Sequence, residues 1–170
     1  MPRDHGSFPN RAKAALLLND VINDLEFPGA AALLEQAIPM AKRVAELRRR
    51  ARKHRIPAIY INDNFGRWKS DFRHIVEHCT GKRVRGAPVS KRLRPKEDDY
   101  FVLKPKHSGF YSTTLDVLLE YLRVDILILT GIATNICVLS TANDAYMRDY
   151  TCTSRAIAWL PIQQMKRATL

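Results

Sequence analysis

The chain has 170 residues, of which 46% are hydrophobic and 26% charged. This composition is ordinary for a globular protein and excludes a largely disordered chain. A domain of this length buries roughly 70% of its unfolded surface, so we expect one domain over residues 1–170, with a flexible segment 1–12. No apolar run approaches the ~20 residues of a membrane span, and no signal-peptide core is evident before Asp20. We therefore predict a cytoplasmic protein without a membrane partner.

The formal net charge of +11 suggests a nucleic-acid partner unless its location provides another explanation. Much of the charge lies in residues 41–55, where basic side chains surround an apolar stripe at helical spacing, formed by Ala41, Val44, Leu47 and Ala51. No aromatic side chains are interleaved for base stacking. We interpret this segment as a solvated helix surface and expect no nucleic-acid partner. A basic nucleic-acid-binding module remains the alternative.

Cys79, Cys137 and Cys152 are odd in number and lack the close spacing of metal ligands. Neither a disulfide framework nor a zinc site is indicated.

Strand and helix signals alternate along the chain. In chain order they predict a strand at 14–19, a helix at 30–54 with a potential break near Pro39, a strand at 57–62, a short helix at 70–78, a loop at 81–99, a strand at 100–103, a helix at 114–122, a strand at 125–130 and a helix at 135–148. This alternation implies right-handed crossovers and a doubly wound, mostly parallel α/β sheet with helices on both faces. The ligand site of such a sheet lies outside the carboxyl ends of its strands.

Polar side chains follow three of the predicted strands. Asp20 follows the first, Lys104 the third, and Cys137 lies in the turn after the fourth. A thiol near a helix N-terminus is favoured as a thiolate, and neighbouring charges set its ionisation. Each residue also has a plain structural interpretation: a loop or cap residue for Asp20, a surface charge for Lys104 and a small buried hydrophobe for Cys137.

Three sequence blocks resemble, in order and spacing, the signature blocks of the isochorismatase-like cysteine hydrolases. They are LLLNDVINDLEF (16–27), VLKPKHSGFYSTTLD (102–116) and LILTGIATNICVLSTANDAYMRDY (127–150). The resemblance implies the same doubly wound fold and a catalytic triad of Asp20, Lys104 and Cys137. It also implies a cofactor-independent hydrolase of a small amide or related C–N bond, with vinyl-ether hydrolysis as a less favoured chemistry.

In the implied mechanism, Asp20 takes the thiol proton and later gives it to the leaving group, while Lys104 favours the thiolate. Cys137 forms a covalent, thioester-type intermediate. The resemblance further implies a cis peptide bond between Ile132 and Ala133, with the N–H groups of Ala133 and Cys137 facing the oxyanion.

The substrate is less determined by the sequence. Asn23, Asp63, Trp68 and Phe110 lie in segments expected to border the pocket, although each also has a plain structural interpretation. Nicotinamidases, a branch of the same family, carry an Asp and two His metal ligands after the second strand. The corresponding stretch here, NDNFGRW (62–68), has no histidine, so we expect neither a metal nor nicotinamide as substrate. His74, His78 and His107 are single histidines, more often surface residues than ligands.

The resemblance ends at Tyr150. Relatives continue with an apolar strand, a polar element and a last helix, whereas residues 151–170 read TCTSRAIAWLPIQQMKRATL. One permitted choice of codons gives a family-like adjacent frame, so a frameshift is favoured over a natural divergent tail. A truncated, catalytically inactive relative is therefore a second alternative. We also expect a homodimer or homotetramer, which the altered tail would affect.

Overall fold

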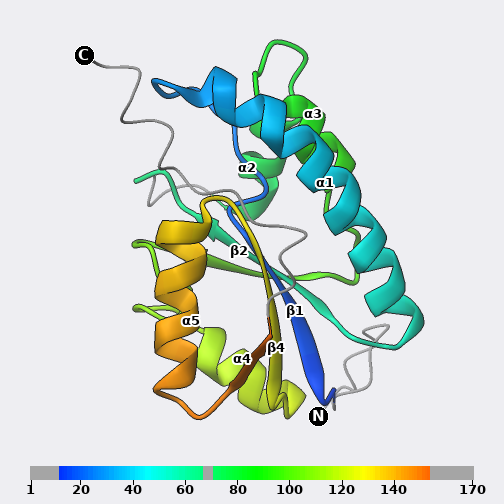
Figure 1. Cartoon of the computed structure of the whole chain (residues 1–170), viewed down its shortest axis with the longest axis vertical. Helices are drawn as coiled ribbons and strands as arrows, with labels where there is room; N and C mark the ends of the chain where they lie inside the picture. Colours follow the sequence, from blue (N-terminus) through cyan, green and yellow to red (C-terminus); the bar gives the residue numbers. More distant parts are fainter. Residues whose placement is uncertain (1–11, 67–70, 154–170) are drawn as a thin grey trace.

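The computed structural model describes residues 12–66 and 71–153. Their strands form one parallel sheet in the order β3-β2-β1-β4-β5 (Figure 1). The strands are β1 (Ala14–Asn19), β2 (Ala58–Asp63), β3 (Tyr100–Lys104), β4 (Ile126–Gly131) and β5 (Thr151–Thr153). Neighbours in the sheet that are distant in sequence require the predicted crossover connections. The doubly wound α/β fold is thus confirmed.

Helices cover both faces of the sheet (Figure 1). One face carries α1 (Ala30–Lys53), α2 (Phe72–Cys79) and α3 (Ala87–Arg92), and the other carries α4 (Leu115–Leu122) and α5 (Leu139–Tyr146). The central strand β1 serves both cores, because Leu16 and Leu18 pack toward the first set of helices and Leu17 toward the second. This alternation follows from the two-residue repeat of a strand.

Three predicted helical or loop segments differ from the structure. Helix α1 runs through Pro39 without a break, since one lost backbone hydrogen bond is outweighed by a long buried face. The predicted loop at 81–99 contains α3, whose short apolar pattern gives little periodicity and which is held by a backbone hydrogen bond from Gly86 to Asp24 at 2.7 Å. The predicted helix at 135–148 is divided into a π-helical turn, Thr134–Val138, followed by α5.

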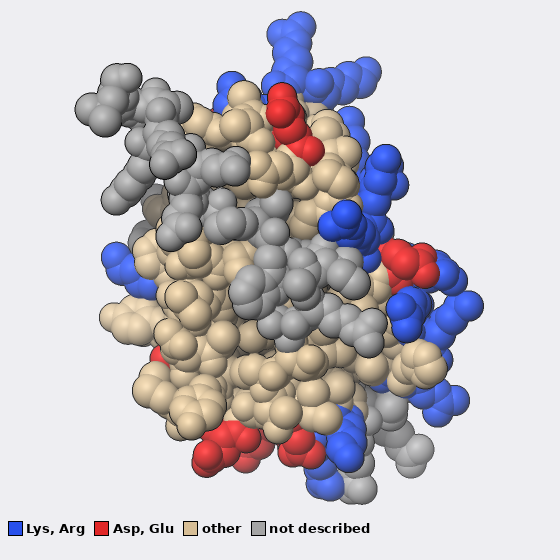
Figure 2. All heavy atoms as spheres, viewed as in Figure 1, with Lys and Arg blue, Asp and Glu red and all other residues tan. Residues whose placement is uncertain are grey.

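Basic side chains gather along the edge of the molecule where α1 runs (Figure 2). Some of them have structural partners: Arg48 lies 3.4 Å from Asp99, and Arg52 pairs with Asp98. These contacts join α1 to the segment that leads into β3. Among the described helices, none combines the length and apolar character needed to cross a bilayer.

The last described strand, β5, is short and exposed. Its three residues pair in parallel with Ile126, Leu127 and Ile128 of β4. Residues 154–170 and the predicted flexible segment up to residue 11 lie outside the described part of the chain.

Candidate active site

The structure brings the three predicted catalytic residues together at the carboxyl edge of the sheet. Asp20 directly follows β1, Lys104 is the last residue of β3, and Cys137 lies in the π-helical turn after β4. The Lys104 side chain reaches past the intervening strand β2, placing its Nζ 2.9 Å from Asp20 Oδ2. The same ammonium donates a hydrogen bond to Cys137 Sγ at 3.6 Å. A carboxylate, an ammonium and a thiol from three separate strand ends therefore share one cluster.

Backbone contacts with β2 hold Asp20 in place. Its φ is 50°, its N–H donates to Ile61 O at 2.8 Å, and its Oδ1 accepts the Asp63 N–H at 2.8 Å. Its Oδ2 is buried and, within residues 12–66 and 71–153, meets Lys104 as an ion pair without a well-aligned hydrogen bond. One carboxylate oxygen is thus committed to orientation, and the other retains the capacity to accept a proton.

A close approach between β1 and β4 places the turn that carries Cys137. Gly131 has a φ of 140°, and a Cβ there would lie 2.1 Å from Asn19 O, so this position requires glycine. Asn19 makes two hydrogen bonds to the carboxyl end of β4. Its Nδ2 donates to Thr130 O at 3.1 Å, and its backbone O accepts the Ile132 N–H at 2.9 Å. The next peptide bond, Ile132–Ala133, is cis.

Thr141 anchors the thiol-bearing turn from the next turn of helix. Its hydroxyl donates to Cys137 O at 2.7 Å and accepts the Gly109 N–H at 3.0 Å. It therefore links the turn of Cys137 to the loop that follows Lys104. The sequence analysis missed Thr141, although its spacing of four residues from Cys137 was an available signal.

Burial dominates the electrostatics of the cluster. It raises the pKa of Cys137 to about 12, and the nearby Asp20 carboxylate adds to the rise while Lys104 opposes it. Burial likewise raises the pKa of Asp20 against the opposing charge of Lys104. For Lys104, burial lowers the pKa, but Asp20 and Cys137 more than offset this, so its pKa lies above the ordinary value.

These pKa directions differ from the expectation of a thiolate stabilised by the helix terminus and Lys104. Desolvation and the neighbouring carboxylate outweigh the ammonium, and the raised pKa favours the protonated thiol. A reaction at Cys137 therefore requires a base to remove the proton.

Two further polar side chains contact this cluster from more exposed positions. Asp63 Oδ2 lies 3.9 Å from Lys104 Nζ, and the Asp63 side chain is 39% exposed. His107 Nδ1 lies 3.9 Å from Cys137 Sγ, and His107 is exposed. Of the histidines weighed in the sequence analysis, His74 and His78 instead pair with Asp71 and Asp24.

Of the predicted pocket residues, Asp63 lies beside the cluster, whereas Asn23 and Phe110 make other contacts. Asn23 stabilises its own loop, its Oδ1 accepting the Leu25 N–H at 2.8 Å. Phe110 is 4% exposed in the core, with its ring 5.9 Å from that of Tyr150, because its segment turns inward toward α5. The contacts of Phe110 are those of a core residue, and its place at the border of a pocket stays a prediction. Trp68 lies outside the described residues.

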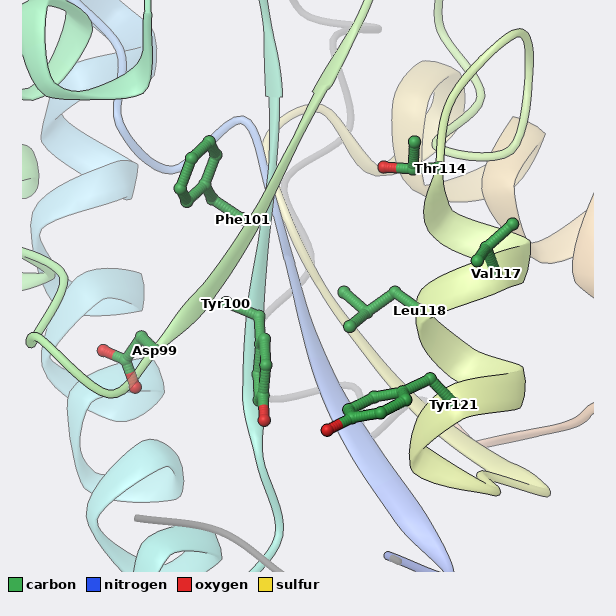
Figure 3. A pocket seen from close by; sticks show the side chains of 7 residues that line it. All are labelled: Asp99, Tyr100, Phe101, Thr114, Val117, Leu118 and Tyr121. Carbon is green, nitrogen blue, oxygen red and sulfur yellow. The ribbon is translucent and has the colours of Figure 1, made fainter. Parts of the chain in front are cut away.

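Two surface hollows lie away from this cluster. A groove of about 430 Å³ runs between β3 and α4 (Figure 3), lined by Asp99, Tyr100, Phe101, Thr114, Val117, Leu118 and Tyr121. A second, of about 390 Å³, lies near the opposite ends of the strands, beside Lys13 and Ile56. Across the described ranges, no group of three or more His, Cys, Asp or Glu side chains is arranged to hold a metal ion.

The fold and this cluster define a class: a parallel α/β protein with an acid–lysine–thiol group at the carboxyl edge of its sheet. Residues 14–155 match the model of the isochorismatase domain. The chain is 44% identical over 144 residues to the uncharacterized isochorismatase family protein YaaI of Bacillus subtilis, covering 85% of this chain and 78% of that protein. The chain belongs to the isochorismatase family of hydrolases.

Two other similarities are to named amide hydrolases. The crystal structure of N-carbamoylsarcosine amidase from Thermoplasma acidophilum superposes with a TM-score of 0.67 at 29% identity, over 87% of this chain and 84% of that one. A ureidoacrylate amidohydrolase, RutB of Methylorubrum extorquens, is 48% identical over 58 residues, covering 34% of this chain and 23% of that protein. The second similarity thus spans only a minor part of either protein.

Proposed function

We propose that the chain hydrolyses a small amide or carbamoyl C–N bond by covalent catalysis at Cys137. The observation that carries the proposal is the position of Lys104 Nζ, 2.9 Å from Asp20 Oδ2 and 3.6 Å from Cys137 Sγ. The amide substrates named for the two relatives support the choice of bond. Neither a metal nor a cofactor is needed for the steps below.

In the first half-reaction, Asp20 Oδ2 accepts the thiol proton as Cys137 Sγ attacks the carbonyl carbon. The carbonyl π electrons move to oxygen and give a tetrahedral oxyanion. Collapse of this species breaks the C–N bond, and Asp20 returns the proton to the departing nitrogen. A buried carboxyl with a raised pKa is suited to both transfers, because it holds a proton more readily than an exposed one.

In the second half-reaction, water hydrolyses the thioester. Asp20 takes one proton from the water, whose oxygen attacks the acyl carbon, and the C–S bond then breaks. The departing sulfur recovers the proton from Asp20, which restores the resting state. Throughout, Lys104 compensates the negative charge that moves between the carboxylate and the sulfur.

We further propose that the N–H groups of Ala133 and Cys137 hold the oxyanion. Both residues belong to the turn that Asn19 and Thr141 position, and Ala133 is 5% exposed, which limits competition from water. Loss of one such donor commonly costs about 10²- to 10³-fold in rate. Asp63, half-buried beside Lys104, is suited to accept an N–H of an amide substrate.

The test combines turnover with alkylation of the thiol. N-carbamoylsarcosine, ureidoacrylate and nicotinamide form the panel, and we expect turnover of an open-chain carbamoyl compound. Cys137→Ala should retain the fold by circular dichroism and lower turnover by on the order of 10³-fold or more. Cys152→Ala is the matched control and should keep full activity.

The Cys137→Ala and Cys152→Ala variants also identify the cysteine that iodoacetamide modifies. Because the pKa of Cys137 is about 12, its modification by iodoacetamide, located by peptide mass spectrometry, should accelerate roughly tenfold per pH unit from pH 7 to 10. Unchanged turnover in Cys137→Ala would exclude the nucleophile, and a rate plateau below pH 8 would show a stabilised thiolate instead.

A further inference from the structure

Cys137 has a neighbour on its open side that the proposed catalytic steps do not use. Asp20 and Lys104 are 5% and 0% exposed, Cys137 is partly buried, and His107 is exposed. Burial therefore decreases from Lys104 through Cys137 to His107. The imidazole of His107 is therefore the more exposed of the two side chains in this contact.

The backbone on both sides of His107 is firmly held. Upstream, the O of Lys104 accepts the Asn64 N–H at 3.2 Å, and Pro105 restricts the chain that follows. Downstream, the Ser108 hydroxyl binds Asp144 of α5, and the Gly109 N–H donates to Thr141 at 3.0 Å. The imidazole is thus presented at the site by a short segment fixed at both ends.

The location of His107 favours a contact with substrate over a role as base. Its Nδ1 lies 3.9 Å from Cys137 Sγ, near the outer limit of a hydrogen bond to sulfur, whereas the Asp20 carboxylate acts on the thiol from the buried side and raises its pKa. Imidazole offers one donor and one acceptor when neutral, so it can bind either the oxygen or an N–H of a carbamoyl group.

We propose that His107 is a substrate-positioning residue that hydrogen-bonds the carbamoyl or amide group on the open side of Cys137. This inference rests on the proposed function, whose nucleophile it takes as given. Asp63 and His107 then present polar atoms to the substrate beside Lys104 and beside the sulfur, respectively. Such a site selects small molecules with several polar atoms around the scissile carbonyl over simple alkyl amides.

The first experiment separates binding from chemistry. The variants are His107→Phe, which removes the polar atoms, and His107→Gln, whose amide approximates the outer nitrogen of the ring. His54→Phe is the matched control, because His54 ends α1 at the opposite edge of the sheet. With N-carbamoylsarcosine, His107→Phe should raise KM roughly tenfold with kcat changed less than threefold. His107→Gln should recover most of the loss, and His54→Phe should match the parent.

A second experiment does not depend on turnover. Cys137 is modified with iodoacetamide, which carries an amide, and with methyl methanethiosulfonate, which does not. His107→Phe should slow only the iodoacetamide reaction, by about threefold to tenfold. Equal slowing of both reagents, or a fall in kcat at constant KM, would show that His107 acts on the thiol and would overturn the proposal, as would parental behaviour in both assays. If no amide is turned over, the proposed function fails, and the reagent comparison still decides the role of His107.

Discussion

Strands β1 and β5 flank the same strand, β4, yet they contribute very differently to the molecule. β1 pairs with β4 over its whole length, from Ala14 opposite Ile126 to Asn19 opposite Gly131, and it is almost entirely buried. β5 pairs only with the first half of β4, up to Ile128, and all of its residues are exposed. β1 therefore contributes to both cores and to the candidate site. The described residues of β5 contribute to neither core and not to the site.

This difference locates the chemistry with respect to the atypical tail. Asp20, Lys104 and Cys137 are held by the ends of β1, β3 and β4, and by contacts from β2 and α5. β5, as far as it is described, stops three residues short of Gly131 and makes no contact with the triad. We infer that changes in the centre of the sheet alter stability and activity together, whereas changes in β5 alter neither strongly.

The largest expected effect comes from Lys104→Met. This substitution leaves the buried Asp20 carboxylate without its counter-charge and should lower the free energy of unfolding by about 3–5 kcal/mol. The unpaired carboxyl then has a folded-state pKa further above its unfolded value, so the loss of stability should grow as pH rises from 5 to 8. Urea denaturation at several pH values measures this. Lys106→Met, an exposed lysine two residues away, is the control, and an equal effect of the two variants would contradict the importance of the buried pair.

A smaller effect is expected from Thr141→Val, which keeps the side-chain shape and removes the hydroxyl. The Gly109 N–H loses its acceptor in a buried position, so the free energy of unfolding should fall by about 1–3 kcal/mol. Because Thr141 also holds the carbonyl of Cys137, turnover should fall while iodoacetamide still reaches the thiol. Thr141→Ser retains the hydroxyl and should restore most of the activity. A valine variant with parental turnover would mean that the turn keeps its geometry without this link.

The sequence predicted the central sheet and the three strand-end residues with little error. Continuous apolar runs at 14–19 and 125–130 are typical of strands buried on both faces, and the rule for parallel sheets places their carboxyl ends at one edge. Asp20, Lys104 and Cys137 were recognisable because each is a reactive side chain at or soon after the end of a predicted strand, and because their spacing resembles one family.

Contacts between segments that are distant in sequence could not be predicted from strand patterns and spacing. Phe110 lies near the site in sequence but turns into the core, and His107, weighed as a single histidine, lies beside the sulfur. The raised pKa of Cys137 depends on burial and on the Asp20 carboxylate, neither of which spacing along the chain reveals. Helix α3 was missed because six residues give too little periodicity to be distinguished from a loop.

The smallest effect is expected in β5. Two variants at one register position of the sheet compare this exposed strand with the buried strands beside it. Cys152 of β5 and Ala15 of β1 both align with Leu127 of β4. Cys152→Ala removes an exposed sulfur from an edge strand and should change the free energy of unfolding by less than about 0.5 kcal/mol. Leu127→Ala, one strand inward and fully buried, should cost about 2–5 kcal/mol through the cavity it leaves. Urea titration of both variants at pH 7 makes the comparison, because Cys152 and Leu127 share a register position and differ chiefly in burial. A loss of more than 1 kcal/mol in Cys152→Ala would show that β5 is packed in solution and would contradict the contrast between β5 and β1.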